Sequence, residues 1–441
     1  MLWLVILKKT LKYSWVIIIR KFKKILLFPL KFLLHIPSFF IVIIIRLISP
    51  FVIVRIASLN IGRIGGTYHA DLYLSEKKCG QYKSGFLDVF YFLKSTDHVN
   101  QQWKKMWGRE LNVLFFSGLA RSVDRVNKLF PGYEKYQIPD STKGCNLMPH
   151  REDYNKYLES RDPAIYAKFN KRLESILMVK KPNLSFTSEE IFIGDRYLRE
   201  IGIPEKTSFI CFHNRDSAFL DLVKSDYDWN YHNYRDSSIQ NYLNAAEAMI
   251  KRGNYAVRLG SITKDKVNSA NPKLIDYANN GMRTDFLDIY LSAKCKFILC
   301  SDTGMSFPAE VFKRPLVYVN WTILLKLPVY ALNGLIIFKK FYLKNEKRFL
   351  SFSELINLDF GGVNTNEIFS NLGLELIENT SEEIRAVTIE MDERLNGTWK
   401  TTEEDEELQQ RFWALFGPDK LKSPDLRIGT EYLRSNKELL G

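Results

Sequence analysis

The sequence predicts an α/β protein whose second half is built on a parallel sheet. Four apolar runs between residues 207 and 320 each end in polar, charged or glycine residues. Near-continuous apolar runs separated by helical segments are typical of strands that are buried on both faces of a parallel sheet. In open sheets of this kind, ligands bind beyond the carboxyl ends of the strands, where these polar residues fall. The pattern therefore predicts a nucleotide-type pocket and an enzyme.

The N-terminal segment differs from the rest of the 441-residue chain in charge. Its first 55 residues contain ten Lys or Arg and no Asp or Glu, so the other 386 carry only +3 of the net +13. This basicity is local, whereas a nucleic-acid-binding domain is basic over a whole face. The longest uncharged run, Phe32 to Ile45, has 14 residues. A spanning helix needs about 20.

Short apolar runs mixed with clustered cations are typical of segments that lie in the interface of an anionic leaflet. The runs repeat and no clear cleavage site follows them, which disfavours a signal peptide. We therefore expect residues 1–50 to form a membrane-associating arm. A spanning or re-entrant segment and a soluble packing arm remain alternatives. The odd number of cysteines (79, 145, 211, 295 and 300) and the lack of Cys-x-x-Cys favour a reducing compartment. The predicted location is the cytoplasmic face of the cell membrane.

Residues 51–182 predict a first Rossmann-like domain, because strand and helix patterns alternate along them. The predicted strands cover residues 51–56, 87–93 and 112–116, and the predicted helices start near Thr67 and cover residues 101–107 and 151–180. A glycine-rich turn, Gly62-Arg-Ile-Gly-Gly, follows the first strand. It does not fit the Gly-x-Gly-x-x-Gly pattern, so a nicotinamide site is disfavoured.

Residues 183–375 predict a second Rossmann-like domain. Predicted helices at residues 188–201, 237–252, 285–293 and 306–312 alternate with strands that begin near residues 207, 255, 296 and 315. The remaining residues, 376–441, predict helices that cross back to the N-terminal domain. The acidic run from Glu403 to Glu407 is interpreted as a solvated helix start.

Three polar segments at the strand ends are candidates for binding a diphosphate. In His213-Asn-Arg-Asp, Arg215 can donate two parallel hydrogen bonds to phosphate, and Asp216 pairs with it or with the donor. The alternatives are that Arg215 and Asp216 only pair with each other and that His213 is a core residue. In Val257-Arg-Leu-Gly, Arg258 adds a second cation and Gly260 permits close approach of the backbone, with an ordinary structural turn as the alternative.

The third segment, Ser301-Asp302-Thr303-Gly304, leads into a helix, where exposed N–H groups favour phosphate. An ordinary helix N-cap is the competing interpretation. Glu310 lies one or two turns further and is a candidate for ribose hydroxyls. Arg235 lies in an aromatic stretch with Tyr227, Trp229, Tyr231 and Tyr234, which either holds a base or sugar or only packs the loop.

In the first domain, Gly65 and Gly66 are the candidate acceptor side. His69 and Asp71 follow them and are the candidate general bases for an acceptor hydroxyl, unless they serve as a helix cap or surface residues. Asp226-Tyr-Asp228 has the Asp-x-Asp form that holds a divalent metal on a diphosphate. Because it is a lone tripeptide beside arginines that bind the same charge, we expect no metal and no other cofactor.

Taken together, these motifs resemble a bacterial family of glycosyltransferases found among surface-polysaccharide genes. The resemblance covers about residues 55 to 320 and rests on Arg63-Ile-Gly, His213-Asn-Arg-Asp, Tyr234-Arg-Asp, Tyr255-Ala-Val-Arg-Leu-Gly, Ile275-Asp-Tyr-Ala, Asp285-Phe-Leu-Asp-Ile-Tyr-Leu, Lys296-Phe-Ile-Leu-Cys-Ser-Asp-Thr-Gly and Val319-Asn. It implies a GT-B-like fold, with two Rossmann-like domains facing across a cleft. The Arg motif is similar to that of fucosyltransferases, which implies that Arg215 holds the donor diphosphate. Many members have His after Arg-Ile-Gly, whereas this chain has Gly66, and His69 is the candidate replacement.

The resulting hypothesis is a metal-independent glycosyltransferase that uses a nucleotide-sugar donor and a glycan acceptor at an anionic membrane surface. We expect the acceptor to be lipid-linked and expect no nucleic-acid partner. The alternative is a non-catalytic nucleotide- or glycan-binding scaffold of the same fold in a polysaccharide assembly complex. A third hypothesis is a metal-dependent transferase that uses Asp226 and Asp228.

Overall fold

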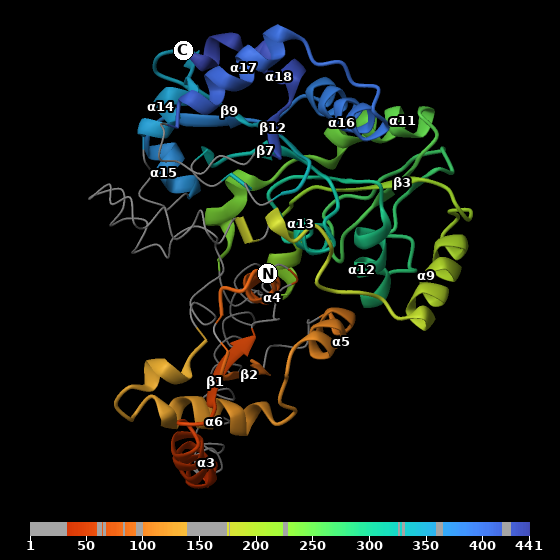
Figure 1. Ribbon diagram of the computed structural model, residues 1–441. Helices are drawn as coiled ribbons and strands as arrows, with labels where there is room; N and C mark the ends of the chain where they lie inside the picture. The colour runs from red at the N-terminus through yellow and green to blue at the C-terminus, as the bar shows by residue number, and fades with distance from the viewer. Residues whose placement is uncertain are drawn as a thin grey trace, which may run out of the picture. The chain divides into compact units, whose positions relative to one another are not determined.

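The computed structural model describes residues 33–59, 64, 68–82, 84–93, 100–138, 174–175, 177–223, 228–324, 327–328, 331–358, 365–416 and 425–441 (Figure 1). The chain divides into two compact units. Unit 1 comprises residues 1–60, 83–94 and 111–142, and unit 2 comprises residues 61–82, 95–110 and 143–441. The α/β class that the sequence predicts is confirmed, because unit 2 contains a seven-stranded sheet in which every pairing is parallel. The predicted domain boundaries remain a prediction.

Unit 1 is built on two parallel strands, β1 (Ile53–Leu59) and β2 (Phe86–Phe92). Isolated parallel bridges join Ile56 to Gln137 and Phe90 to Val113 at the two sides of this pair. The predicted strand over residues 112–116 is thus reduced to one bridge. Arg55 and Asp88 are opposite each other in the register and form a buried ion pair, with Nε 2.6 Å from Oδ1.

Two helices of unit 1, α3 (His35–Leu47) and α6 (Ser117–Asn127), pack against each other and against β1. Their apolar contact residues form a small core together with strand residues. Polar side chains of the two helices are also hydrogen-bonded to each other: Ser122 Oγ lies 2.8 Å from His35 Nδ1, and Arg46 Nε donates to Asn127 Oδ1 at 3.0 Å. A 3-10 turn, Tyr133–Tyr136, follows α6.

The sheet of unit 2 has the strand order β12-β8-β7-β6-β3-β4-β5. Its strands are β3 (Phe209–His213), β4 (Tyr255–Arg258), β5 (Leu274–Ile275), β6 (Ile298–Cys300), β7 (Leu316–Trp321), β8 (Gly334–Phe338) and β12 (Leu426–Ile428). The chain adds strands outward on one side from β3 to β5, then returns to the other side of β3 with β6. The boundary between β3 and β6 is therefore the topological switch point, where open α/β sheets bind ligands.

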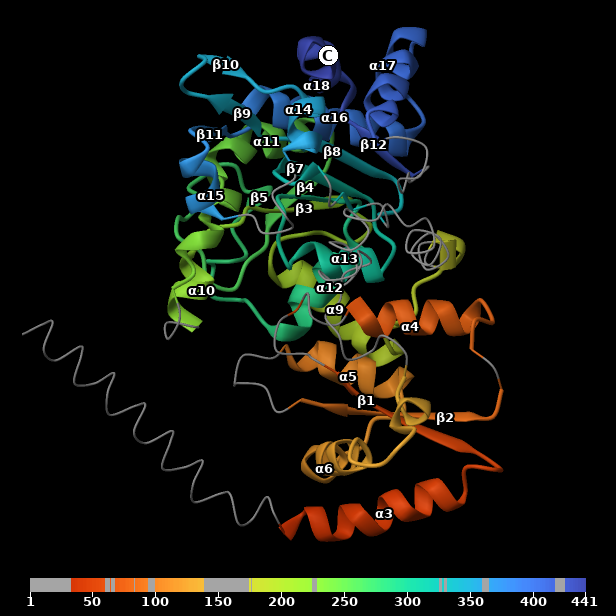
Figure 2. The ribbon, with the colours of Figure 1, turned by 90° about the vertical axis from the view of Figure 1, so that its left-hand side faces the viewer.

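Helices cover both faces of this sheet, and Figures 1 and 2 show them in two layers. On one face lie α11 (Leu243–Lys251) and α16 (Ser381–Asn396), which pack side by side. On the other face lie α9 (Ser188–Glu200), α12 (Asp285–Lys294) and α13 (Ser306–Val311). Helices α4 (Tyr68–Lys78) and α5 (Gln101–Glu110) belong to unit 2, where α5 packs against α12 and α4 against α13. The near-continuous burial of β3, β6, β7 and β8 follows from this double cover.

A smaller antiparallel sheet has the order β10-β9-β11. Its strands are β9 (Lys340–Leu343), β10 (Arg348–Phe349) and β11 (Leu374–Ile377), and the short helices α14 (Phe352–Asn357) and α15 (Asn366–Asn371) lie between them in sequence. Strand β9 follows β8 after one residue, Lys339, so the two sheets are joined at that residue.

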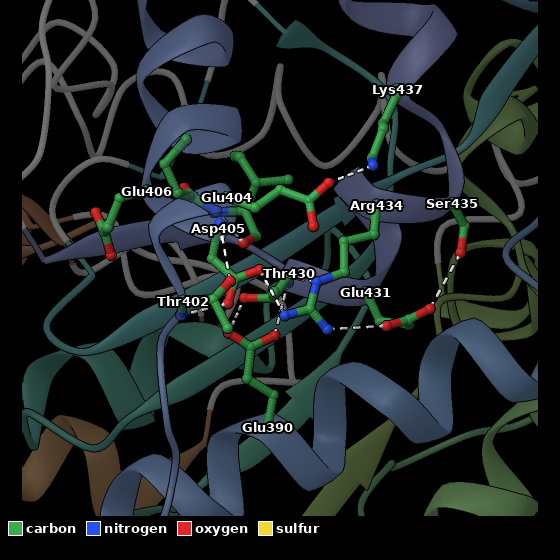
Figure 3. Close-up of polar contacts among 12 residues, drawn as sticks. Glu390, Thr402, Glu404, Asp405, Glu406, Thr430, Glu431, Arg434, Ser435 and Lys437 are labelled. Atoms are coloured by element: carbon green, nitrogen blue, oxygen red, sulfur yellow. Dashed lines mark hydrogen bonds and ion pairs between the residues drawn. The ribbon is translucent and has the colours of Figure 1, made fainter.

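A network of polar contacts joins the C-terminal helices to one another (Figure 3). Helix α17 (Glu403–Ala414) begins at the predicted acidic run, and Thr402 and Asp405 form a capping box. Asp405 is buried, however, and accepts hydrogen bonds from Arg434 of α18 (Thr430–Ser435), so the interpretation of the whole run as solvated was wrong for this residue. The predicted return of residues 376–441 to the N-terminal domain remains a prediction.

No helix in the described ranges is both long enough and apolar enough to cross a membrane. Residues 1–32 of the predicted membrane arm lie outside the described residues, and helix α3 is the part of the arm that the structure describes. The cysteines at positions 79, 211, 295 and 300 form no disulfide, and burial raises the pKa of the Cys211 and Cys300 thiols.

Candidate functional site

The switch point of the large sheet brings together two of the predicted segments. Strand β3 ends at His213 and β6 ends at Cys300, and the segments that follow meet where the backbone N–H of Arg215 donates to Ser301 Oγ at 2.8 Å. Ser301 is fully buried, so this hydrogen bond fixes the two strand ends to each other. The predicted juxtaposition of the Arg215 and Ser301 segments is thus present in the fold.

Arg215 lies at this point with a buried guanidinium that is only partly satisfied. Its Nη1 forms an ion pair with Asp236, while Nη2 has no hydrogen-bond partner among the described residues. Burial and, to a lesser extent, the nearby Arg235 lower the pKa of Arg215 to about 10. A buried cation with an unused donor is costly unless an anion completes its shell. Arg215 therefore has the geometry of an anion-binding residue.

A second arginine, Arg235, lies close enough to Arg215 to lower its pKa. Arg235 ends a 3-10 helix (Asn230–Arg235), and its Nη2 donates to the carbonyl of Asp302 at 2.7 Å. Its Nε is also 3.0 Å from the Asp302 carboxylate. Asp302 therefore orients Arg235 toward the switch point instead of acting alone on a ligand.

Lys339 is a third cation in this region, and sequence reasoning missed it. It follows β8, is buried, and donates from Nζ to the carbonyls of Asp236 (2.5 Å) and Tyr234 (3.2 Å). Burial lowers the pKa of Lys339 to about 8, and Arg215 contributes to the decrease. The signal was present, because Lys339 follows an apolar run as the other site residues do.

Arg258 ends the neighbouring strand β4 and is fully buried. Its Nη1 donates to the carbonyl of Asp265 and lies 3.7 Å from the Asp276 carboxylate, whereas Nε and Nη2 have no partner among the described residues. Burial lowers the pKa of Arg258, and the carboxylates of Asp276, Asp216 and Asp265 oppose this effect. Asp216 also holds the loop, since its Oδ2 accepts from the N–H of Lys264 at 3.0 Å.

His213 and Gly260 lie beside each other between β3 and β4. The Nδ1 atom of His213 is 2.9 Å from the carbonyl oxygen of Leu259, and burial lowers the pKa of the imidazole to about 4. Because that carbonyl can only accept, Nδ1 carries a proton, and the lowered pKa favours the neutral imidazole at pH 7. Gly260 has φ +151°, and a Cβ there would lie 2.7 Å from Thr263 Cγ2. The turn therefore requires glycine at this position.

The turn from Ser301 to Gly304 leads into helix α13. Ser301 Oγ is used by Arg215, and the carbonyl of Thr303 accepts from Ser306 Oγ at 3.0 Å. Met305, the N-cap residue, makes no side-chain cap. The competing interpretation of an N-cap by Ser301, Asp302 or Thr303 therefore does not describe this turn.

Glu310 and Asp71 lie near each other, in α13 and α4 of unit 2. Burial raises the pKa of Glu310 to about 7; its Oε1 accepts from the Tyr318 hydroxyl at 2.7 Å, and its Oε2 has no hydrogen-bond partner among the described residues. Asp71 is buried and its carboxylate is engaged by Lys313 Nζ (3.2 Å) and Asn183 Nδ2 (2.8 Å). This pairing favours a structural role for Asp71.

Several predicted residues are not placed by the structure. Gly65, Gly66 and Asp226 lie outside the described residues, and of His69 only its position in helix α4 is described. Asp228 Oδ1 accepts from the N–H of Asn230 at 2.9 Å and starts the 3-10 helix. No group of three His, Cys, Asp or Glu side chains suited to a metal occurs within the described ranges. Metal independence remains a prediction.

The aromatic stretch forms a compact stack. The rings of Trp229 and Tyr231 lie 6.1 Å apart, those of Tyr231 and His232 3.9 Å apart, and the ring of Tyr234 packs edge-on against Phe369 at 5.2 Å. Trp229, Tyr231, His232 and Tyr234 are all partly exposed. The stretch is therefore partly loop packing, at Tyr234, and partly an accessible aromatic surface.

Comparison with known proteins gives weak structural similarities. The sequence matches no protein-family model and no curated protein. A glycosyl transferase family 9 structure from Veillonella parvula has a TM-score of 0.40 and 10% identity, covering 78% of this chain and 97% of that chain. The E. coli ADP-heptose LPS heptosyltransferase II has a TM-score of 0.29 and 14% identity, covering 60% and 84%.

A UDP-N-acetylglucosamine 2-epimerase structure is also similar, with a TM-score of 0.29 and 11% identity, covering 79% of this chain and 98% of that chain. Because these TM-scores are below 0.5, the similarity does not assign the activity of any of those proteins to this chain. The α/β assignment rests on the strand order and the parallel register of the sheet itself.

Proposed function

We propose that this chain is a glycosyltransferase that transfers a sugar from a nucleotide-activated donor to a glycan acceptor. The observation that carries the proposal is the buried, incompletely bonded guanidinium of Arg215 at the switch point between β3 and β6. Sugar transfer from such a donor releases a nucleoside diphosphate, whose developing charge must be stabilised. Arg215 supplies a fork of donors for that charge, which a point charge would bind with less geometric specificity.

Neighbouring residues support the same function. Arg235 and Lys339 increase the positive potential around Arg215, which attracts a doubly charged leaving group. In this proposal, the unused Oε2 of Glu310 accepts hydrogen bonds from ribose hydroxyls, and the partly exposed rings of Trp229 and Tyr231 stack on the base or sugar. Arg258 and Gly260 shape the adjoining turn.

The acceptor side of the proposal follows from the N-terminal part of the chain. The GT-B arrangement would present the acceptor from the first domain, with His69 as the candidate base. The clustered Lys and Arg of residues 1–32 would hold the enzyme at an anionic membrane surface, where a lipid-linked acceptor of polysaccharide synthesis is located. Cations in place of a metal would make the reaction metal-independent.

A nucleotide screen tests the proposal directly. Purified protein would be melted with UDP, GDP, ADP, TDP and CDP, because a ligand present at 100 times its Kd stabilises the native state by about 3 kcal/mol. We expect one nucleoside diphosphate to raise Tm, and Arg215→Ala to abolish the increase. The matched control is Arg199→Ala, which removes an exposed arginine paired with Glu205 in the same unit. No stabilisation by any nucleotide would contradict the proposal.

Turnover separates the enzyme from a scaffold of the same fold. The nucleotide that stabilises the protein would be offered as its sugar conjugates, and release of the free nucleoside diphosphate would be measured with and without chelator. Release that persists in chelator and is lost in Arg215→Ala is the expected result. Binding without release supports the non-catalytic scaffold, and release that requires metal supports the Asp226 and Asp228 hypothesis.

A further inference from the structure

Helix α3 is apolar on two opposite sides. Its inner side packs against α6 and buries Val42 and Ile45. On the outer side, spacing of three to four residues aligns four exposed apolar side chains, namely Ile36, Phe40, Ile44 and Leu47. A surface helix in water normally has a polar outer face, whereas a helix that is apolar all round is normally covered. Nothing in the described ranges covers this stripe.

A second exposed apolar element lies at the start of helix α6. Phe115 is 99% exposed and Phe116 is 79% exposed, the highest values for any phenylalanine in the described residues apart from Phe51. They adjoin the N-terminal end of α3, because a Cβ on Gly118 would lie 3.8 Å from Leu34 Cδ1. Leu129, at the other end of α6, is also exposed and precedes Phe130, whose ring contacts Phe39 at 5.8 Å. The exposed side chains thus come from two separate segments that pack together.

Positive charge accompanies this apolar surface. Arg121 and Arg125 are exposed and share one side of α6, and Lys128, the exposed residue after the helix, continues their spacing while it pairs with Asp124 at 3.3 Å. The single charged residue of α3, Arg46, is directed inward, where it donates to Asn127 and to the carbonyl of Pro131 at 2.9 Å. The outer stripe of α3 therefore carries no charge. The sequence that directly precedes α3, residues 1–32, adds eight Lys or Arg and no acidic residue.

We propose that the outer stripe of α3, Phe115, Phe116 and Leu129 form one surface of unit 1 that inserts into the interface of an anionic lipid bilayer. The apolar side chains enter the headgroup and acyl boundary while the cations of α6 contact anionic headgroups. Exposed phenylalanines beside cations fit this partner better than an apolar protein surface, because an apolar surface would leave Arg121 and Arg125 uncompensated. This inference deepens the proposed membrane attachment, since it makes folded unit 1 a second determinant beside the basic arm.

The test is flotation of the full-length chain with lipid vesicles. Vesicles of phosphatidylglycerol and phosphatidylcholine would be compared with phosphatidylcholine alone. We expect wild type to bind the anionic vesicles, and Phe115→Ser/Phe116→Ser to reduce the partition coefficient about tenfold, because two large side chains no longer leave water. Arg121→Gln/Arg125→Gln is expected to weaken binding and to reduce its salt dependence.

The matched control is Phe192→Ser/Leu222→Ser, which removes two apolar side chains of unit 2 that are 67% and 69% exposed. This variant should float as wild type does, and all variants should keep the wild-type Tm. Unchanged flotation of Phe115→Ser/Phe116→Ser would overturn the proposal. If wild type were a dimer and Phe115→Ser/Phe116→Ser lost the dimer while its partition coefficient stayed unchanged, the proposal would also be wrong. The surface would then join two copies of the chain. Nucleotide binding is measured separately, so its failure would affect the proposed function and not this surface.

Discussion

Two arginines of unit 2, the half-buried Arg434 and the buried Arg215, differ in how completely their guanidinium groups are bonded. All three guanidinium nitrogens of Arg434 have acidic partners, with Nε and Nη2 on Asp405 at 2.8 and 2.7 Å and Nη1 on Glu431 at 3.5 Å (Figure 3). Arg215 is more deeply buried, yet it contacts one carboxylate and leaves Nη2 unused. A saturated network stabilises the fold, whereas an unsaturated buried cation requires a further partner.

Two buried glutamates repeat the contrast. Glu390 accepts from the N–H of Thr430 at 2.7 Å, from its hydroxyl at 2.9 Å and from Arg394 Nε at 2.9 Å. Glu310 accepts from Tyr318 on one oxygen and has no partner for the other.

Arg215 follows β3, Arg258 ends β4 and Glu310 lies in the helix after β6, and each has a polar atom without a hydrogen-bond partner among the described residues. Arg434 and Glu390 of the C-terminal helices are fully bonded, although Tyr432 and Arg427 in the same part of the chain also have an unpaired atom. Hydrogen-bond saturation thus distinguishes these site residues from Arg434 and Glu390.

The largest expected effect comes from breaking the saturated network. Arg434→Met leaves the Asp405 carboxylate buried with only the Thr402 capping contacts, and we expect the free energy of unfolding to fall by about 3 kcal/mol. Nucleotide binding should be unchanged. Urea unfolding followed by circular dichroism measures the first quantity and nucleotide-dependent melting the second. Equal stability of the variant and wild type would show that this network does not hold α17 and α18 in place.

The effect of pH on stability offers a second way to sharpen the comparison. The pKa of Glu310 is raised by burial to about 7, so the native state keeps a proton that the unfolded state loses near pH 4.5. Stability contributed by the neutral form is therefore present below pH 4.5 and lost as pH rises through 7. We expect Glu310→Gln to match wild type at pH 4.5 and to be more stable by about 3 kcal/mol at pH 8.

Urea unfolding at both pH values checks this expectation, and Glu390→Gln is the matched control. It removes a carboxylate whose two oxygens are both engaged, so it should lower stability at pH 4.5 and at pH 8 alike. A Glu310→Gln variant whose stability relative to wild type does not change with pH would mean that the pKa of Glu310 is the same in the native and unfolded states.

Much of the sheet could be predicted from the sequence, because strands that are buried on both faces must be continuously apolar. The strands predicted near residues 207, 255, 296 and 315 correspond to β3, β4, β6 and β7, and their boundaries differ by two residues or fewer. Strands β8 and β12 were missed, although the run Gly334–Phe338 carries the same signal. The strand order could not be predicted, because it depends on which helices pack on which face.

The sequence allowed us to predict which residues belong to the candidate site, but not which of them contact each other. Arg215 and Ser301 were expected to contact one ligand, and the structure shows in addition that they contact each other. The partner of Arg215, Asp236, lies 21 positions away across an irregular aromatic loop, and no local pattern links the two. For the same reason, the carbonyl contacts that hold Lys339 and the burial of Asp405 were absent from the sequence analysis.

The smallest expected effects come from two glycines, Gly397 in the C-terminal helices and Gly260 in the candidate site. Gly397 ends α16 with φ +72° and open space around its Cα, so Gly397→Ala should cost about 1 kcal/mol of stability and leave nucleotide binding unchanged. Gly260→Ala should cost a similar amount, since φ +151° is strained for alanine and its Cβ would press on Thr263. It should also weaken the nucleotide-dependent shift in Tm, because Gly260 lies between His213 and the Arg258 turn. If both variants lost only stability, the β3–β4 side of the sheet would belong to the structural network, and the nucleotide would contact the β3–β6 side alone.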